Sequence, residues 1–221
     1  MSARVRLWLI DAHYQIFRAY HAMPDLRAPD GRPVGALRGY ASTLVKFLAE
    51  QKPTHVAAAW DDEATSFRNE LYADYKKGRT EFPADLEPQL ALCAEVTEAL
   101  GVRVARAETF EADDVIATLT ARALDRGAEV AIVTADKDMA ALVSERVSLF
   151  DPRSDSLLGP AAVEARLGVP PDLVPDFLTL VGDAVDNVPG VPGIGAKTAA
   201  LLLRRFGRIE SIPADPREWA G

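Results

Sequence analysis

The stretch VAIVTADKD, residues 130–138, carries a short apolar run that ends in two aspartates. Runs of this length between polar residues are typical of strands buried in a parallel sheet. Residues 7–10 lead in the same way into Asp11, and residues 55–60 lead into Asp61. The carboxyl ends of parallel strands gather along one edge of a sheet, where ligands usually bind. The sequence therefore predicts an α/β fold with an acidic edge.

These aspartates belong to a larger acidic set, spread along the chain but placed where apolar runs stop. Like charges at contact distance cost several kcal/mol in a site of low dielectric constant, so one cleft can hold them only with cations. Hard divalent ions prefer oxygen ligands, and we therefore expect Mg²⁺ or Mn²⁺. The nine candidate ligands are Asp11, Asp61, Glu111, Asp113, Asp114, Asp136, Asp138, Asp183 and Asp186.

The composition is that of an ordinary soluble protein, with 48% of the 221 residues hydrophobic and 26% charged. No apolar run is long enough to cross a bilayer, and the N-terminus lacks a signal-peptide pattern, so we expect a cytoplasmic protein with no membrane partner. The single cysteine, Cys93, excludes an intramolecular disulfide and cysteine-based zinc chemistry. Its helical spacing with Leu86, Leu90 and Leu100 favours a place in the core.

A formal net charge of −8 is unusual for a nucleic-acid-binding protein. The nine candidate ligands account for all of this negative balance, so the remaining surface is nearly neutral. One basic segment has Arg68, Lys76, Lys77 and Arg79 within a dozen residues, with aromatic residues among them. Cations that hold phosphates and rings that stack on bases suit single-stranded DNA. The alternative is a solvated charged face whose tyrosines pack inward.

The spacing of apolar residues predicts the remaining elements. After Asp151, prolines separate short helical pieces, and no further strand is expected. We expect further strands over residues 102–105 and 147–150, and helices over residues 14–22, 35–50, 67–77, 86–100, 163–167 and 200–206, with one more from Glu111 to Gly127.

Three acids open the helix that starts near Glu111, where the helix dipole alone would favour them. At about 100° per residue, Glu111 and Asp114 lie roughly 60° apart around the helix while Asp113 points elsewhere. The three therefore cannot all bind one ion directly, and some would act through water or through other ligands. Asp136 also has an alternative role, because an aspartate after a strand is often the N-cap of the next helix.

Four segments together resemble the 5′-nuclease family, which includes the 5′→3′ exonuclease domain of bacterial DNA polymerase I and the flap endonucleases. They occur in the family's order and cover nearly the whole chain. One of the four segments consists of Trp60-Asp61 followed by residues 66–79. The three most specific segments are Glu-Ala-Asp-Asp at 111–114, Thr-Ala-Asp-Lys-Asp at 134–138 and Gly-Asp-x-x-Asp-Asn at 182–187.

The resemblance implies two structural units. Residues 1–165 would form a PIN-like α/β nuclease core, a mostly parallel sheet flanked by helices, with a helical arch at about residues 66–88. Residues 166–221 would form a small helical unit of the helix-hairpin-helix (helix-three-turn-helix) type that binds DNA. Relatives continue through several more helices beyond Gly221, so a compact form and a fragment of a longer nuclease or polymerase both stay open. Ala12 departs from the glycine that relatives commonly carry after the first aspartate.

The activity that the resemblance implies is that of a metal-dependent 5′→3′ exonuclease and structure-specific 5′-flap endonuclease. Such enzymes act in replication or repair on DNA with 5′ ends, flaps, nicks or gaps, or on RNA primers paired with DNA, by two-metal hydrolysis of phosphodiesters. The first metal would be held by Asp11, Asp61, Glu111 and Asp113, with Asp114 close by. The second metal or its water shell would be held by the remaining candidates, Asp136, Asp138, Asp183 and Asp186.

The same resemblance gives roles to the basic residues of the arch. Lys76 and Arg79 would face phosphates, and Arg68 would lie near the scissile bond, which makes Lys76 and Arg68 the candidate catalytic side chains. Tyr72 and Tyr75 would contact the single strand.

Two further DNA contacts are implied outside the arch. Arg18 matches a family arginine near the 5′ end of the substrate. A glycine-rich turn that opens a helix can hold a phosphate through its backbone N–H groups, although it can also be a simple tight turn. The resemblance implies that this turn, called the hairpin below, binds the duplex backbone without contacting bases, with K⁺ between its carbonyls and a phosphate. Its residues are Gly190, Gly193, Gly195, Lys197 and Thr198.

A catalytically silent junction-binding protein of the same fold is the main alternative. Buried carboxylates without a metal would be costly, which argues against it. A PIN-like ribonuclease is usually shorter and lacks the hairpin unit, and a Rossmann-like enzyme should carry a Gly-rich loop where residues 11–14 have none. We expect a monomer, because the sequence contains no heptad and no repeat. The action on DNA that the resemblance implies would place the protein at the nucleoid.

Overall fold

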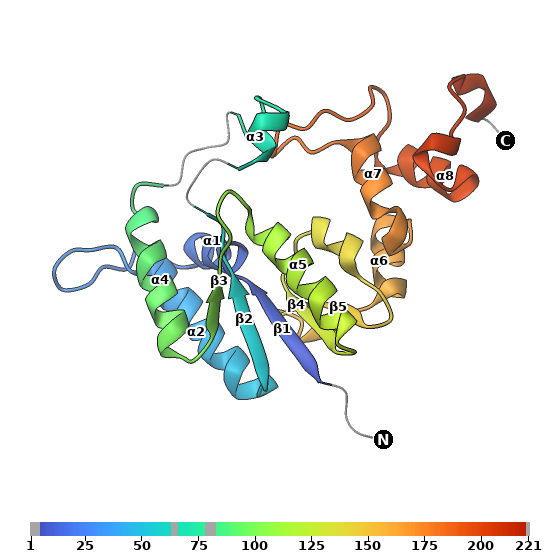
Figure 1. Cartoon of the computed structure of the whole chain (residues 1–221). Coiled ribbons are helices and arrows are strands. Elements are labelled where there is room, and N and C mark those ends of the chain that lie inside the picture. Colours follow the sequence, from blue (N-terminus) through green and yellow to red (C-terminus); the bar gives the residue numbers. More distant parts are fainter. Residues whose placement is uncertain (1–4, 63–65, 78–82, 220–221) are drawn as a thin grey trace.

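The computed structural model describes residues 5–62, 66–77 and 83–219 (Figure 1). Six strands form one sheet in the order β3-β2-β1-β4-β5-β6. The first five are parallel, and β6 pairs with β5 in antiparallel orientation. The mostly parallel α/β sheet predicted from the sequence is therefore confirmed. The strands are β1 (Arg6–Asp11), β2 (His55–Ala59), β3 (Arg103–Ala105), β4 (Glu129–Val133), β5 (Val147–Asp151) and β6 (Ser156–Leu158).

Helices cover both faces of the sheet, and the strands are apolar on both sides for that reason. Trp8 and Ile10 pack with the first group of helices, whereas Leu9 between them packs with the second, as the two-residue period of a strand requires. Cys93 lies buried in the first group, as predicted. The first group is α1 (Ala12–Ala22), α2 (Gly35–Gln51) and α4 (Glu87–Ala99). The second is α5 (Ala112–Asp125), η1 (Asp138–Leu142), α6 (Pro160–Leu167), α7 (Val174–Val181) and α8 (Ala196–Phe206).

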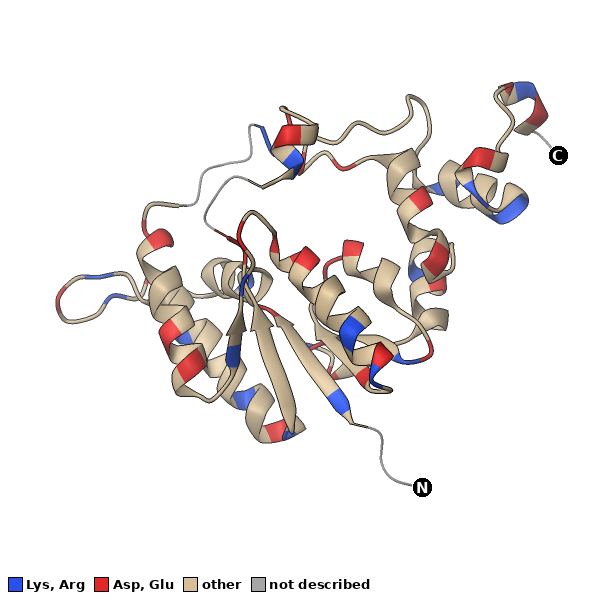
Figure 2. Cartoon of the chain, in the orientation of Figure 1, with Lys and Arg blue, Asp and Glu red and all other residues tan. Residues whose placement is uncertain are grey.

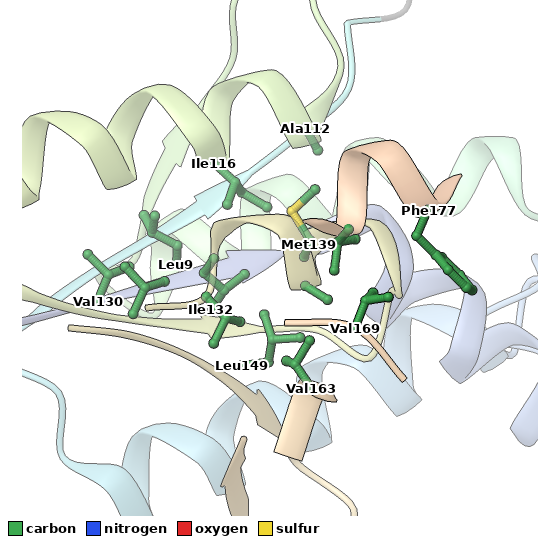
Figure 3. Packing of buried hydrophobic residues seen from close by; sticks show 14 of the residues in the cluster. Leu9, Ala112, Ile116, Val130, Ile132, Met139, Leu149, Val163, Val169 and Phe177 are labelled. Carbon is green, nitrogen blue, oxygen red and sulfur yellow. The ribbon is translucent and has the colours of Figure 1, made fainter. Parts of the chain in front are cut away.

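The C-terminal helices share a core with the sheet. Figure 3 shows Val163, Val169 and Phe177 in the same packed cluster as Leu9 and Ile132 of the central strands. This shared core fixes α7, and the loop that follows it, beside the carboxyl edge of the sheet (Figure 1). Short 3₁₀ turns complete the region: η2 (Pro171–Leu173), η3 (Ile209–Ser211) and η4 (Pro216–Trp219). Within the described residues, no helix has both the length and the apolar character needed to cross a bilayer.

The expectation that no strand follows Asp151 is wrong. β6 is only three residues long and is joined to β5 by a tight turn in which Asp155 has a φ of 47°. A strand this short lacks a periodic signal of its own, and its pairing with β5 is what defines it.

The expected helix over residues 67–77 is also wrong, and so is the single helix face on which the basic residues were expected. Only α3 (Arg68–Leu71) is helical. Tyr72 is extended, and the Lys76 N–H donates to the carbonyl of Asp186 at 2.9 Å instead of to a helical partner. A tertiary contact therefore replaces helical hydrogen bonds in this segment, which sequence periodicity cannot show.

Candidate metal centre and nucleic-acid interface

Asp11 ends β1 at the centre of the sheet edge and is buried. Its carboxylate caps α1 by accepting from the Tyr14 N–H, and it also accepts from the hydroxyl of Thr134 at 3.0 Å. Thr134 follows β4 and is fully buried, and its hydroxyl oxygen accepts from the Asp136 N–H at 3.1 Å. Burial, offset in part by these hydrogen bonds, raises the pKa of Asp11 to about 7. Thr134 thus joins two predicted ligands that follow neighbouring strands.

Asp61 lies beyond β2 and ties the start of α5 to the same edge. Its side chain accepts from the Ala112 N–H at 2.7 Å, and its own N–H donates to the ring of His13 at 3.1 Å. An N–H at the first turn of a helix has no partner within the helix, so an acidic acceptor there stabilises it. This bond sets the position of the acids that follow on α5.

Asp113, in the first turn of α5, is the point where the acidic residues converge. Burial comes first among the causes that raise its pKa to about 8, followed by the negative charges of Asp11, Asp136, Asp61 and Glu111. These acids come from four places in the sequence, and hydrogen bonds through Thr134 and the Ala112 N–H hold Asp11, Asp136 and Asp61 to the same edge as the start of α5. The predicted gathering of strand-end acids at one edge is thus present in the structure, and Figure 2 shows acidic residues above the strand ends and at the start of α5.

Glu111 precedes α5 and faces two side chains of the segment 66–77. Lys76 lies 2.9 Å from its carboxylate, and the Tyr75 hydroxyl donates to it at 3.1 Å and to Asp186 at 3.3 Å. Burial and these two acidic neighbours raise the pKa of Tyr75. Tyr75 is therefore oriented toward the acids, whereas Tyr72 is exposed.

Arg68 makes a two-pronged ion pair with Asp114, at 2.7 and 2.8 Å. Asp114 also accepts from the Glu111 N–H at 3.0 Å, so both of its oxygens are engaged. Partial burial raises the pKa of Asp114, but the Arg68 guanidinium and the Glu111 N–H outweigh burial and leave it lowered. As predicted from the angles around α5, Asp113 and Asp114 face different partners.

The second group of acids surrounds Lys137. Its ammonium lies 2.9 Å from Asp183, which also accepts from the Val185 N–H. Asp136 accepts from the Asp138 N–H, and one oxygen of Asp138 is buried with no hydrogen-bond donor among the described residues. Burial and the charge of Asp136 raise the pKa of Asp138 to about 6. A buried carboxylate oxygen without a donor is suited to a cation.

The donor set fits a hard divalent ion, because it consists of carboxylate oxygens and includes a buried Asp138 oxygen with no hydrogen-bond donor among the described residues. Within residues 5–62, 66–77 and 83–219, no three of these side chains stand at the spacing of one coordination sphere.

The remaining predicted DNA contacts lie on other elements of the fold. Arg18 is on α1 and half-buried, and one of its guanidinium nitrogens has no acceptor among the described residues. Lys197 and Thr198 are exposed in the first turn of α8. Arg79 lies outside the described residues.

The hairpin glycines have different surroundings. Gly193 has a φ of 82°, and a Cβ placed on Gly193 or Gly195 would meet nothing within 4 Å among the described residues. A Cβ on Gly190 would lie 2.3 Å from the Val181 carbonyl oxygen, and one on Gly182 would clash with the Gly190 N–H. Gly190 is therefore required for packing, whereas Gly193 and Gly195 leave their backbone open to a ligand.

Sequence reasoning did not assign a role to Thr134 or Asn187. Both lie inside recognised motifs, and a polar residue directly after a buried strand is the signal that could have identified Thr134. Asn187 has a φ of 57°, and its side-chain amide donates to the Asp74 carbonyl at 2.7 Å, a contact that no local pattern encodes.

An α/β sheet whose acidic carboxyl edge is faced by a lysine and an arginine is typical of metal-dependent nucleases. The model of the 5′-3′ exonuclease N-terminal resolvase-like domain matches residues 6–168, and that of the 5′-3′ exonuclease C-terminal SAM fold matches residues 169–220. The chain therefore belongs to the 5′-3′ exonuclease family.

Curated relatives agree with this assignment. The chain is 43% identical over 214 residues to DNA polymerase I of Rhizobium leguminosarum. The matched region covers 93% of this chain and 21% of the polymerase. It is 36% identical over 206 residues to a 5′-3′ exonuclease of Aquifex aeolicus (strain VF5), which covers 93% of the chain and 71% of that protein. The chain thus spans about a fifth of the polymerase and most of the exonuclease.

Solved structures confirm the fold. The T5 D15 protein, co-crystallised with metal ions, matches with a TM-score of 0.78 at 21% identity, over 94% of this chain and 78% of that one. Flap endonuclease-1 from Methanococcus jannaschii matches with a TM-score of 0.57 at 16% identity, over 91% and 71% of the two chains.

Proposed function

We propose that the chain is a divalent-metal-dependent 5′→3′ exonuclease and 5′-flap endonuclease that hydrolyses DNA phosphodiesters during replication or repair. The observation that carries this proposal is the convergence of Asp113 with Asp11, Asp136, Asp61 and Glu111. Family membership supports the reaction class. The substrates would be 5′ ends, flaps, nicks and gaps, including RNA primers paired with DNA, acted on by a nucleoid-associated monomer.

Two Mg²⁺ or Mn²⁺ ions would be held by the acidic residues, and would supply an activated water and stabilisation of the leaving oxygen. Asp11, Asp113 and Asp136 are the central candidates, since the site converges on them. Asp114 would serve mainly to orient Arg68, because both of its oxygens are engaged. The further candidates are Asp61, Glu111, Asp138, Asp183 and Asp186.

The chain's own cations would bind and orient the substrate. Lys76 lies at the acidic edge, where its ammonium would contact the phosphate that is cleaved. Arg68 lies beside it, and Tyr72 is exposed for stacking on a base. Arg18, Arg79, Lys197 and Thr198 would contact phosphates farther from the reaction. Residues 1–165 would form the nuclease unit and residues 166–221 the duplex-binding unit, with K⁺ at the hairpin.

A time course on a 5′-labelled flap, with and without Mg²⁺, tests the proposed activity. We expect short labelled products only when Mg²⁺ is present, and their length distinguishes release of single nucleotides from cleavage at the base of the flap. Binding of the flap with no cleavage in either Mg²⁺ or Mn²⁺ would contradict the activity and favour the silent junction-binding alternative.

Thr134 provides a test of the metal site that needs no DNA. Thr134→Val keeps the shape of the side chain but removes the hydroxyl that bridges Asp11 and Asp136. Loss of such a supporting hydrogen bond typically weakens metal binding about 10-fold or more. Calorimetric titration with Mn²⁺ should show this loss in Thr134→Val and not in Thr134→Ser, which keeps the hydroxyl. Equal affinities for all three proteins would remove Thr134 from the site.

The hairpin can be tested by comparing two glycines. Gly195→Ala places a methyl group in open space and needs no positive φ, so the melting temperature should fall only by the few degrees that alanine costs at a helix N-cap. Duplex affinity should fall about 10-fold for all sequences, equivalent to ~1.4 kcal/mol, if a phosphate approaches this backbone. Gly190→Ala should lower the melting temperature much more, because its methyl group meets the Val181 carbonyl. Wild-type duplex binding by Gly195→Ala would argue against the hairpin grip.

A further inference from the structure

Two segments that are far apart in the sequence meet above the acidic edge. The segment 66–77 carries α3, and the loop 182–188 follows α7 (Figure 1). The Lys76 N–H donates to the Asp186 carbonyl at 2.9 Å, and the Asn187 side-chain amide donates to the Asp74 carbonyl at 2.7 Å. The Tyr75 hydroxyl donates to the Asp186 carboxylate at 3.3 Å. Three hydrogen bonds therefore join three consecutive residues of the segment 66–77 to two consecutive residues of the loop 182–188.

The backbone at this joint is strained on both sides. Lys76 has a φ of 55° and Asn187 a φ of 57°, and both lie in the left-handed region. Asparagine tolerates this conformation, whereas a residue such as lysine adopts it only at a steric cost. A strained conformation persists when the surrounding structure holds it. Two of the hydrogen bonds that hold this turn come from the loop 182–188, and a third comes from Asn69, whose side-chain amide donates to the Tyr75 carbonyl at 2.9 Å.

The left-handed turn at Lys76 sets the direction of its side chain. With this turn, the Lys76 ammonium lies 2.9 Å from the Glu111 carboxylate and so faces the candidate metal centre. In a continuous helix, the Lys76 side chain would point in a different direction. The bond from Asn187 to Asp74 fixes the chain two residues before the turn, and thereby fixes the turn.

The loop that provides these contacts is itself well ordered by hydrogen bonds. Asp183 and Val188 exchange both backbone hydrogen bonds, at 2.8 and 2.7 Å, and Asp183 also pairs with Lys137. Gly190, directly beyond the loop, packs on the Val181 backbone at the start of the hairpin. The loop therefore connects the hairpin, through defined hydrogen bonds, to the segment that carries Lys76.

We propose that Asn187 is a positioning residue for Lys76, and that it links the duplex-binding hairpin to the side chain that faces the reaction. This inference rests on the proposed nuclease function. Asn187 lies outside the acidic set and is exposed at the surface. Through it, a duplex bound at the hairpin would control the position of the Lys76 ammonium.

The test uses Asn187→Gly, which removes the amide and adopts a positive φ without steric cost. The single-turnover cleavage rate of a flap at saturating protein should fall about 10-fold, because small displacements of a reacting group have effects of this size. Duplex affinity should stay unchanged, and the melting temperature should fall by no more than about 2–4 °C, as expected for the loss of one hydrogen bond of an exposed side chain. Val185→Ala, in the same loop and 66% exposed, is the matched control and should cleave at the wild-type rate.

A double-mutant cycle shows whether Asn187 acts through Lys76. In the Lys76→Ala background, Asn187→Gly should cause no further loss, because residues that act as one unit are not additive. A wild-type rate in Asn187→Gly, or the same 10-fold loss in both backgrounds, would overturn the inference.

Amide hydrogen exchange of the segment 66–77, measured without metal or DNA, tests the joint itself. We expect protection of the Lys76 N–H in the wild type and in Val185→Ala, and faster exchange in Asn187→Gly. Equal exchange in all three proteins would overturn the positioning role whether or not the wild type cleaves DNA. Absence of cleavage by the wild type would instead contradict the proposed function.

Discussion

Asp113→Asn is expected to lower the single-turnover rate of flap cleavage by at least about 1000-fold, since removal of one group that stabilises transition-state charge costs this much. Asp113 is the acid on which the charges of Asp11, Asp136, Asp61 and Glu111 converge. Its replacement by a neutral amide of the same shape removes a ligand without leaving a cavity. Flap binding in Ca²⁺ should persist, because the candidate DNA contacts are elsewhere.

The same substitution is expected to stabilise the metal-free protein. A partly buried carboxylate beside four others disfavours the folded state, and asparagine relieves this repulsion. The melting temperature without metal should rise by several degrees, at about 2–4 °C for each 1 kcal/mol in a chain of this size. Addition of Mn²⁺ should then raise it less than in the wild type.

Asp125→Asn is the matched control, because Asp125 is exposed at the far end of the same helix. It should change neither the cleavage rate nor the melting temperature. Wild-type cleavage by Asp113→Asn, or a fall in its metal-free melting temperature, would contradict the role given to Asp113.

Lys76→Ala is expected to lower the single-turnover rate about 100-fold, with little change in duplex affinity. The Lys76 ammonium faces Glu111 at the acidic edge, and a positioned charge at a reacting phosphate typically has an effect of this size. The experiment compares cleavage at saturating protein with equilibrium binding in Ca²⁺.

Lys77→Ala separates this role from general attraction of DNA. Lys77 is 70% exposed and pairs with Asp74 on the outside of the segment. Its loss should change the cleavage rate less than about 3-fold, as expected for a single exposed charge. Equal losses in the two variants would indicate that neither lysine has a specific place at the reaction.

The sheet and its acidic edge were predictable because they depend on local patterns. A buried parallel strand is a continuous apolar run, and the run before Asp136 is as clear as those before Asp11 and Asp61. Helix angles alone placed Asp113 and Asp114 toward different partners, and Asp114 indeed pairs with Arg68. These features need no information about distant contacts.

The segment above the acidic edge was not predictable, because tertiary contacts decide its shape. Spacing of apolar and basic residues predicted one helix, but the N–H of Lys76 bonds to a carbonyl more than a hundred residues away. Asn187 has no signal in the sequence until that contact is known. Gly190 was assigned to DNA binding, and only the structure shows that its missing side chain is required for packing against Val181.

A crystal soaked in Mn²⁺ and measured for anomalous scattering tests the central claim most directly. We predict anomalous peaks at the carboxyl edge of the sheet, with oxygens of Asp11, Asp113 and Asp136 drawn within ligand distance of the ions. Density that leaves these side chains apart, with no peak among them, would contradict the account.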